Sequence, residues 1–84
     1  MRNVVFRKWN DGQIIALFPD EPWNNDYMTT SYMHAGQHGA ADYTEVINKT
    51  TLPNKNEYQE LLNELQSIGY TDLRILERSS PKVR

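Results

Sequence analysis

The sequence predicts a single α+β domain with a small, antiparallel-rich four-stranded sheet in the order β-β-β-α-β and one long helix packed on one face. Three observations support this class. Two runs of strand-forming residues flank an Asp-Gly pair, residues 54–68 carry an apolar stripe of helical period, and a short alternating segment follows them. We place the domain at residues 1–78 and a flexible C-terminal tail at residues 79–84.

The chain begins with a predicted β-hairpin. Residues 3–9 and 14–18 are rich in valine, isoleucine and aromatic residues, which favour strands. Between them, Asp11 and Gly12 supply the positive φ angles that a tight turn requires. We expect Pro19 to end the second strand, because proline cannot donate a hydrogen bond to a ladder.

A polar segment and a third strand come next. Residues 19–29 contain two prolines, two asparagines and two aspartates, so a loop is expected there. Trp23 and Tyr27 lie within this loop, and we expect them to fold back on the core. Residues 30–35 alternate between two faces, which predicts the third strand.

The clearest element is a helix over residues 54–68. Its predicted buried stripe consists of Tyr58, Leu61, Leu62, Leu65 and Ile68. Asn54 is placed to cap the first turn, Glu57 stands at the capping-box position, and Gly69 follows as a left-handed residue. A short helix within residues 41–49 and a last strand over residues 72–78 complete the prediction.

Composition excludes several classes of function. The chain has 9 basic and 11 acidic residues and a net charge of −2, so general nucleic-acid binding is not expected. It has no cysteine, which excludes disulfides, thiolate metal sites and cysteine nucleophiles. The longest apolar run, residues 14–18, is far shorter than the roughly 20 residues of a membrane span. A cytoplasmic protein is therefore the default expectation.

Residues 31–43 differ from ordinary scaffold. They hold both histidines of the chain and two of its four glycines. We expect a ligand-binding loop over residues 34–42, and the candidate site residues are Arg7, Trp9, Tyr32, His34, Gly36, Gln37, His38, Gly39, Asp42 and Tyr43.

The residue types suggest a role for each part of this loop. Gly36 and Gly39 would allow a sharp turn and close approach of the backbone to a ligand. Gln37 and His38 would donate hydrogen bonds. Arg7 would supply the countercharge, Tyr32 or Trp9 a stacking face, and a helix starting near residue 40 free N–H groups for an anion.

Other interpretations of the same segment remain open. His34, His38 and Asp42 would make a two-histidine, one-carboxylate metal site, although the intervening glycines disfavour the helix that such spacing needs. His38 oriented by Asp42 would serve as an acid–base pair, with Ser31 as a nucleophile. In a purely structural interpretation, the glycines form turns and the polar side chains tie loop carbonyls together.

Three segments of the chain resemble a known group of proteins. They are Val5-Phe6-Arg7-Lys8, Ile15-Ala16-Leu17-Phe18-Pro19 and Ser31-Tyr32-Met33-His34-Ala35-Gly36-Gln37-His38-Gly39-Ala40-Ala41-Asp42-Tyr43. Together with Glu57-Tyr58 and Ile68-Gly69-Tyr70, they resemble a family of short uncharacterised proteins of bacteriophages and mobile elements. The likeness covers about residues 3–76, and Gly-Gln-His-Gly is its most specific part. The family implies no catalytic residues.

The resemblance implies an accessory role in the host cell cytoplasm. Some small phage proteins inhibit host defence, as anti-CRISPR proteins do, and others sequester a nucleotide signal, as anti-Thoeris and anti-CBASS proteins do. We expect a non-enzymatic protein that binds a nucleotide-like ligand through the loop and needs no cofactor. The alternatives are a protein–protein inhibitor of a host complex, with a contact patch that includes Trp23 and Tyr27, and a small metal- or histidine-dependent hydrolase. A homo-oligomer is a plausible assembly, because a subunit interface would deepen a shallow pocket.

Overall fold

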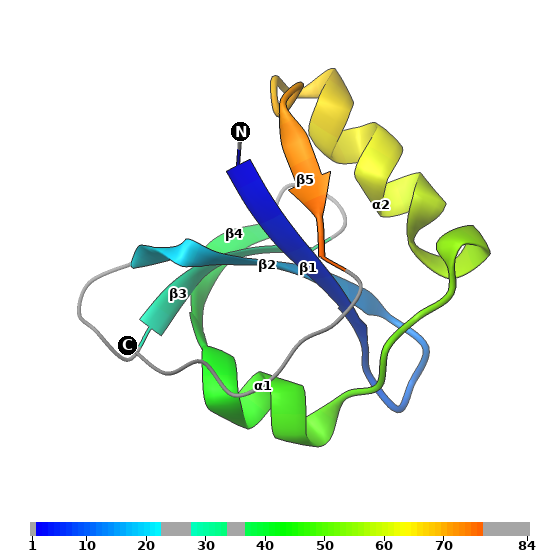
Figure 1. Ribbon diagram of the computed structural model, residues 1–84. Coiled ribbons are helices and arrows are strands. Elements are labelled where there is room, and N and C mark those ends of the chain that lie inside the picture. Colours follow the sequence, from blue (N-terminus) through cyan, green and yellow to red (C-terminus); the bar gives the residue numbers. More distant parts are fainter. Residues whose placement is uncertain (1, 23–27, 34–36, 77–84) are drawn as a thin grey trace.

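The computed structural model describes residues 2–22, 28–33 and 37–76, with backbone only for Pro22 and Gln37 (Figure 1). Its elements are β1 (Arg2–Lys8), β2 (Ile14–Pro22), β3 (Met28–Met33), β4 (Gln37–Asp42), α1 (Tyr43–Lys49), α2 (Lys55–Ser67) and β5 (Leu73–Ile75). The strands form one mixed sheet in the order β4-β3-β2-β1-β5. The predicted tail, residues 79–84, lies outside the described residues.

The α+β class is confirmed, but the predicted four-stranded sheet is one strand too small. The additional strand is β4, which pairs with β3 over six consecutive residues, from Met28 opposite Asp42 to Met33 opposite Gln37. Its glycine and alanines are weak strand formers, so the segment resembles a turn in sequence. The predicted last strand is also shorter, and it runs parallel to β1 while the other three neighbouring pairs are antiparallel.

The prediction that Pro19 ends the second strand is wrong. Strand β2 continues to Pro22, and its register against β3 shifts between Phe18 and Pro22. The prolines therefore lie at an irregularity of the ladder, where a missing N–H is tolerated. Residues 19–22 and 28–29 of the predicted loop therefore belong to strands, and Trp23 and Tyr27 lie outside the described residues. The third strand occupies residues 28–33, slightly earlier in the chain than expected.

The sheet is covered on both faces, which makes a three-layer arrangement (Figure 1). Helix α2 covers the cluster of Val4, Phe6, Ala16, Phe18, Tyr32, Tyr58, Leu61, Leu62 and Leu65. Helix α1 covers the opposite cluster of Val5, Ile15, Leu17, Ala41, Tyr43, Val46 and Ile47. The predicted short helix is thus confirmed, and it supplies a second face to the core.

Helix α2 is capped at both of its ends as the sequence predicts. Asn54 accepts a hydrogen bond from the Glu57 N–H and Glu57 accepts one from the Asn54 N–H, which completes the capping box. At the other end, Gly69 has a φ of 117°, a conformation that side chains rarely adopt. The expectation that Ile68 is buried is wrong, because it is the C-cap residue and is 50% exposed.

One ion pair joins β1 to the first turn of α2. The Lys8 ammonium group donates to the Glu57 carboxylate, beside the capping hydrogen bond. Two hydrogen bonds lower the pKa of Glu57. The bond from Lys8 has the larger effect, and the bond from the backbone N–H of Asn54 has the smaller one. The ionised carboxylate is thus stabilised in the folded chain relative to the unfolded one.

Neither helix of the described part of the chain has the length and apolar character that crossing a bilayer requires.

Replacing Asn54 by alanine should lower the free energy of unfolding by about 1 kcal/mol, because the Glu57 N–H loses its acceptor. Chemical denaturation measures this change. Asn56→Ala is the matched control, since Asn56 is exposed in the same turn. Equal effects of the two substitutions would contradict the cap.

Glu57→Gln should weaken the protein at neutral pH, because the amide keeps an acceptor for the Asn54 N–H but cannot form the ion pair with Lys8. A lowered folded-state pKa stabilises the fold above the unfolded-state pKa, and this contribution is lost as pH falls through the folded-state value. The stability curves of the two proteins should therefore converge in acid. Denaturation across a pH series measures this, with exposed Glu60→Gln as control; a constant difference at all pH values would refute the assignment.

Candidate functional site

Two of the predicted site residues meet on the α2 face of the sheet. Tyr32 of β3 lies directly opposite His38 of β4, and their ring centroids are 4.6 Å apart in an edge-on arrangement. Tyr32 is buried and its hydroxyl donates to Glu64 of α2, whereas His38 is exposed. The imidazole is therefore available to solvent and rests on a fixed aromatic ring.

Tyr70 completes this group of side chains. Its hydroxyl is 3.0 Å from Nε2 of His38, and its ring stacks on Phe18 with a centroid distance of 5.2 Å. The backbone N–H groups of Tyr70 and Gly69 donate to the carbonyls of Leu65 and Gln66, which is the Schellman arrangement. The C-terminal cap of α2 thus places Tyr70 over the sheet.

Arg2, the first residue of β1, stacks on the ring of Tyr70. Its guanidinium carbon is 4.8 Å from the centre of the Tyr70 ring, and its Nε is 2.8 Å from the Glu21 carboxylate. Stacking and the ion pair together orient the planar fork. Within residues 2–22, 28–33 and 37–76, its two terminal nitrogens have no hydrogen-bond partner. We call the group Arg2, Phe18, Tyr32, His38 and Tyr70 the Tyr70 site.

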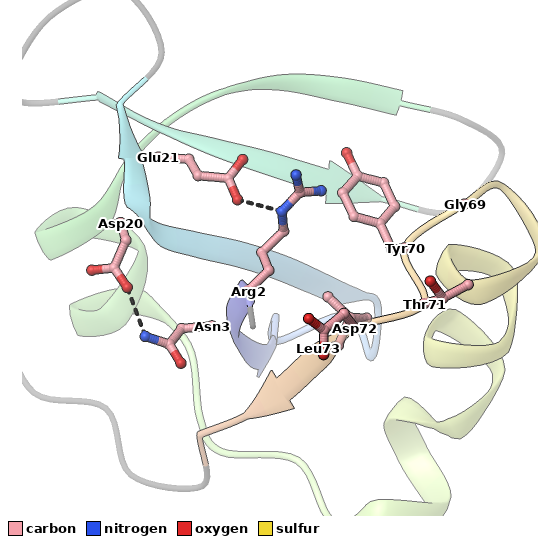
Figure 2. A pocket seen from close by; sticks show the side chains of 9 residues that line it. All are labelled: Arg2, Asn3, Asp20, Glu21, Gly69, Tyr70, Thr71, Asp72 and Leu73. Atoms are coloured by element: carbon pink, nitrogen blue, oxygen red, sulfur yellow. Dashed lines mark hydrogen bonds and ion pairs between the residues drawn. The ribbon is translucent and has the colours of Figure 1, made fainter.

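A cleft of about 440 Å³ lies beside the Tyr70 site (Figure 2). Its lining comes from the start of β1, the end of β2 and the α2–β5 connection, and consists of Arg2, Asn3, Asp20, Glu21, Gly69, Tyr70, Thr71, Asp72 and Leu73. Glu21 neutralises Arg2, and Asp20 accepts a 2.7 Å hydrogen bond from the Asn3 amide. The cleft thus combines one oriented cation with carboxylate acceptors, and three carboxylates make it acidic overall.

Arg7 does not join this site. It lies on the α1 face of β1, opposite to His38, and is only 8% exposed. Its guanidinium donates to the Thr50 hydroxyl and to the carbonyls of Thr50 and Ile47, at 2.6–3.1 Å. Burial lowers the pKa of Arg7, and the charge interaction with Tyr43 opposes this shift. Instead of serving as a ligand countercharge, Arg7 satisfies the carbonyls at the end of α1.

The other predicted site residues are spread over the α1 side and the length of β4. Trp9 follows β1 and packs partly buried against the α1-side cluster. Tyr43 is the buried first residue of α1, and the Asp42 carboxylate caps that helix by accepting from the Glu45 N–H. Gly39 lies within β4 opposite Ser31, so the expectation that it forms a sharp turn is wrong.

His38 and Asp42 are too far apart to act together within one chain. Three residues of extended strand lie between them, so their Cα atoms are four steps, or about 13 Å, apart at the usual rise per residue. They therefore cannot bind one metal ion or form a hydrogen-bonded acid–base pair in the same subunit. Across the described ranges, no three histidine, aspartate or glutamate side chains gather as a metal site would require. His34, Gly36 and the side chain of Gln37 lie outside the described residues.

Sequence reasoning missed Arg2, Tyr70 and the cleft. A signal existed for Tyr70, because a residue directly after the C′ glycine of a helix packs back on the last turn. The local pattern contains no such signal for Arg2, whose position depends on the pairing of β1 with β5.

Comparison with protein-family models, curated proteins and solved structures finds no match to the chain.

Arg7→Met should lower the free energy of unfolding by about 1–3 kcal/mol, because it leaves buried carbonyls at the end of α1 without donors. The measurement is chemical denaturation. Arg74→Met, at an exposed position of β5, makes the same chemical change. Its free energy of unfolding should stay within about 0.5 kcal/mol of that of the parent protein. If Arg7→Met proves no more harmful than Arg74→Met, the structural role of Arg7 is wrong.

Proposed function

We propose that the protein is a small non-enzymatic binding protein that sequesters a nucleotide-like ligand at the Tyr70 site and its cleft. This keeps the phage-type accessory role implied by the sequence resemblance, and it moves the ligand from the loop around residues 34–42 to the surface that His38 shares with Tyr70. The observation that carries the proposal is the Arg2 guanidinium, oriented by Glu21 and Tyr70.

The oriented guanidinium suits a phosphate group. Arginine binds phosphate oxygens in a bidentate manner, and a fork that is already held in place loses little side-chain entropy on binding. His38 supports the Tyr70 ring at its hydroxyl, which lies 3.0 Å from Nε2 of the imidazole. The ring that carries the guanidinium is thus fixed by stacking on Phe18 and by the contact of its hydroxyl with His38.

The carboxylates of the cleft restrict the charge of the ligand. Its lining includes the carboxylates of Asp20, Glu21 and Asp72, and the exposed Asp20 suits hydroxyl or amino donors, as a ribose or a base would present. The same carboxylates repel additional phosphates. The cleft therefore favours a ligand with one negative charge, such as a cyclic mononucleotide, over a nucleoside triphosphate.

The hydrolase alternative requires groups that act on one bond, and the distance between His38 and Asp42 along β4 removes the pair that the sequence suggested. The inhibitor alternative would use a contact patch that includes Trp23 and Tyr27, and both residues lie outside the described part of the chain. Recovery of one specific host protein in a pull-down, without any ligand effect, would favour it.

A thermal-shift titration tests the proposal. Cyclic mononucleotides should raise Tm in a concentration-dependent manner, with a stabilisation of about 2.7 kcal/mol when the ligand is at a hundred times its Kd. ADP-ribose should act more weakly and ATP least, because their added charge meets the cleft carboxylates.

Variants separate the proposed site from unspecific binding. Arg2→Gln should abolish the shift, and Tyr70→Phe should reduce it, because the ring under Arg2 loses the contact of its hydroxyl with His38. Arg74→Gln is the matched control, since it removes the same charge from an exposed strand position outside the cleft. No shift with any nucleotide, or an equal shift in Arg2→Gln, would refute the proposal.

A further inference from the structure

Strand β4 is an outer edge of the sheet. It pairs with β3 on one side, and every second residue of an edge strand directs its N–H and C=O away from its neighbour. Apart from the β3 ladder and the first turn of α1, no backbone hydrogen bond joins residues 37–42 to another described residue. Its outer edge therefore has the capacity to accept another strand.

The two edges of the sheet differ in how they resist such pairing. Edge strands are usually protected by short length, charged side chains, proline or a bulge. Strand β5 is only three residues long and carries Arg74 in its middle. Strand β4 has six residues, no lysine, arginine or proline, and a ladder without a register shift. Its central residues Gly39, Ala40 and Ala41 are small, so a second backbone can approach without a steric obstacle.

We propose that two copies of this chain associate through antiparallel pairing of their β4 strands, centred on Ala40. This register places Ala40 opposite its own copy, and it places His38 opposite the partner's Asp42 on both sides of the two-fold axis. The resulting assembly is a continuous ten-stranded sheet, twice the five strands of one chain. It does not depend on the ligand proposed above.

Complementary hydrogen-bonding groups favour a second copy of the chain as the partner that pairs with β4. Directly opposed side chains on an antiparallel pair lie about 4.5–5.5 Å apart at Cβ, within contact range for histidine and aspartate. His38 uses Nε2 for Tyr70, and Asp42 uses Oδ1 for the Glu45 N–H, so Nδ1 and Oδ2 have no partner in the described part of the chain. The two-fold axis brings these two groups together twice. Within one chain the same two residues are too far apart to meet.

The assembly would also complete the Tyr70 site. The partner's Asp42 would hold the His38 imidazole from the side opposite to Tyr70, so that each site contains one residue from the other chain. A site on an 84-residue chain would thus gain a contact from a second subunit.

Sedimentation and light scattering of the full chain over a wide concentration range provide the first test. The mass should approach twice 9.8 kDa as concentration rises. Ala40→Lys should raise the dimer dissociation constant at least about tenfold, because two ammonium groups would face each other at the axis. Gln66→Lys, at an exposed position of α2, adds the same charge and should leave the constant unchanged. A monomer at every concentration, or equal constants for the two variants, would overturn the proposal.

Cysteine cross-linking tests the register itself. The chain has no cysteine, so Ala40→Cys introduces a single thiol. Opposed residues of an antiparallel pair have Cα atoms about 4.5–5.5 Å apart, which lies within the range of a disulfide. Under mild oxidation this variant should form a linked dimer at least about tenfold faster than Gln66→Cys at equal concentration. Equal rates would exclude pairing centred on Ala40, even if the protein proved dimeric.

Discussion

The burial of β1 on both of its faces is the constraint on which the rest of this structure depends. Val4 and Phe6 pack under α2, while Val5 packs under α1 and Arg7 donates to the end of that helix, and all four side chains are buried. Since successive side chains of a strand point to opposite faces, one helix cannot cover them all. The small α1 is therefore as necessary to the core as the longer α2, and the sheet lies between two layers.

The same alternation places the two arginine side chains of β1 on opposite faces of the sheet, one buried and one accessible. Arg7 has an odd position in β1 and is buried towards α1, where it satisfies carbonyls that would otherwise lack donors. Arg2 belongs to the same strand but points towards α2, where Tyr70 and Glu21 orient it at an accessible position. The two arginines of this strand thus have different roles, because odd positions of β1 face α1 and even positions face α2.

The accessible site depends on the end of a helix. Gly69 takes the left-handed conformation that stops α2, and this turn directs Tyr70 back over Phe18 and next to His38. A ring fixed by stacking and by backbone hydrogen bonds is a rigid support for Arg2 over the ring and for His38 at the hydroxyl. The edge strand β4 brings His38 to this support, and in the proposed dimer it also receives the partner's Asp42.

Local sequence determined the hairpin, α2 with both of its caps and the existence of α1, because turn residues, capping side chains and apolar periodicity act over a few neighbouring positions. It also singled out Tyr32 and His38, which do meet. Tertiary structure alone decided that the segment after β3 is a strand, because weak strand formers were placed by pairing with β3 and not by their own propensity. Tertiary structure likewise decided that Arg2, and not Arg7, lies beside Tyr70. Arg2 and Tyr70 are 68 positions apart in the sequence, and a local sequence pattern cannot predict a contact over that separation.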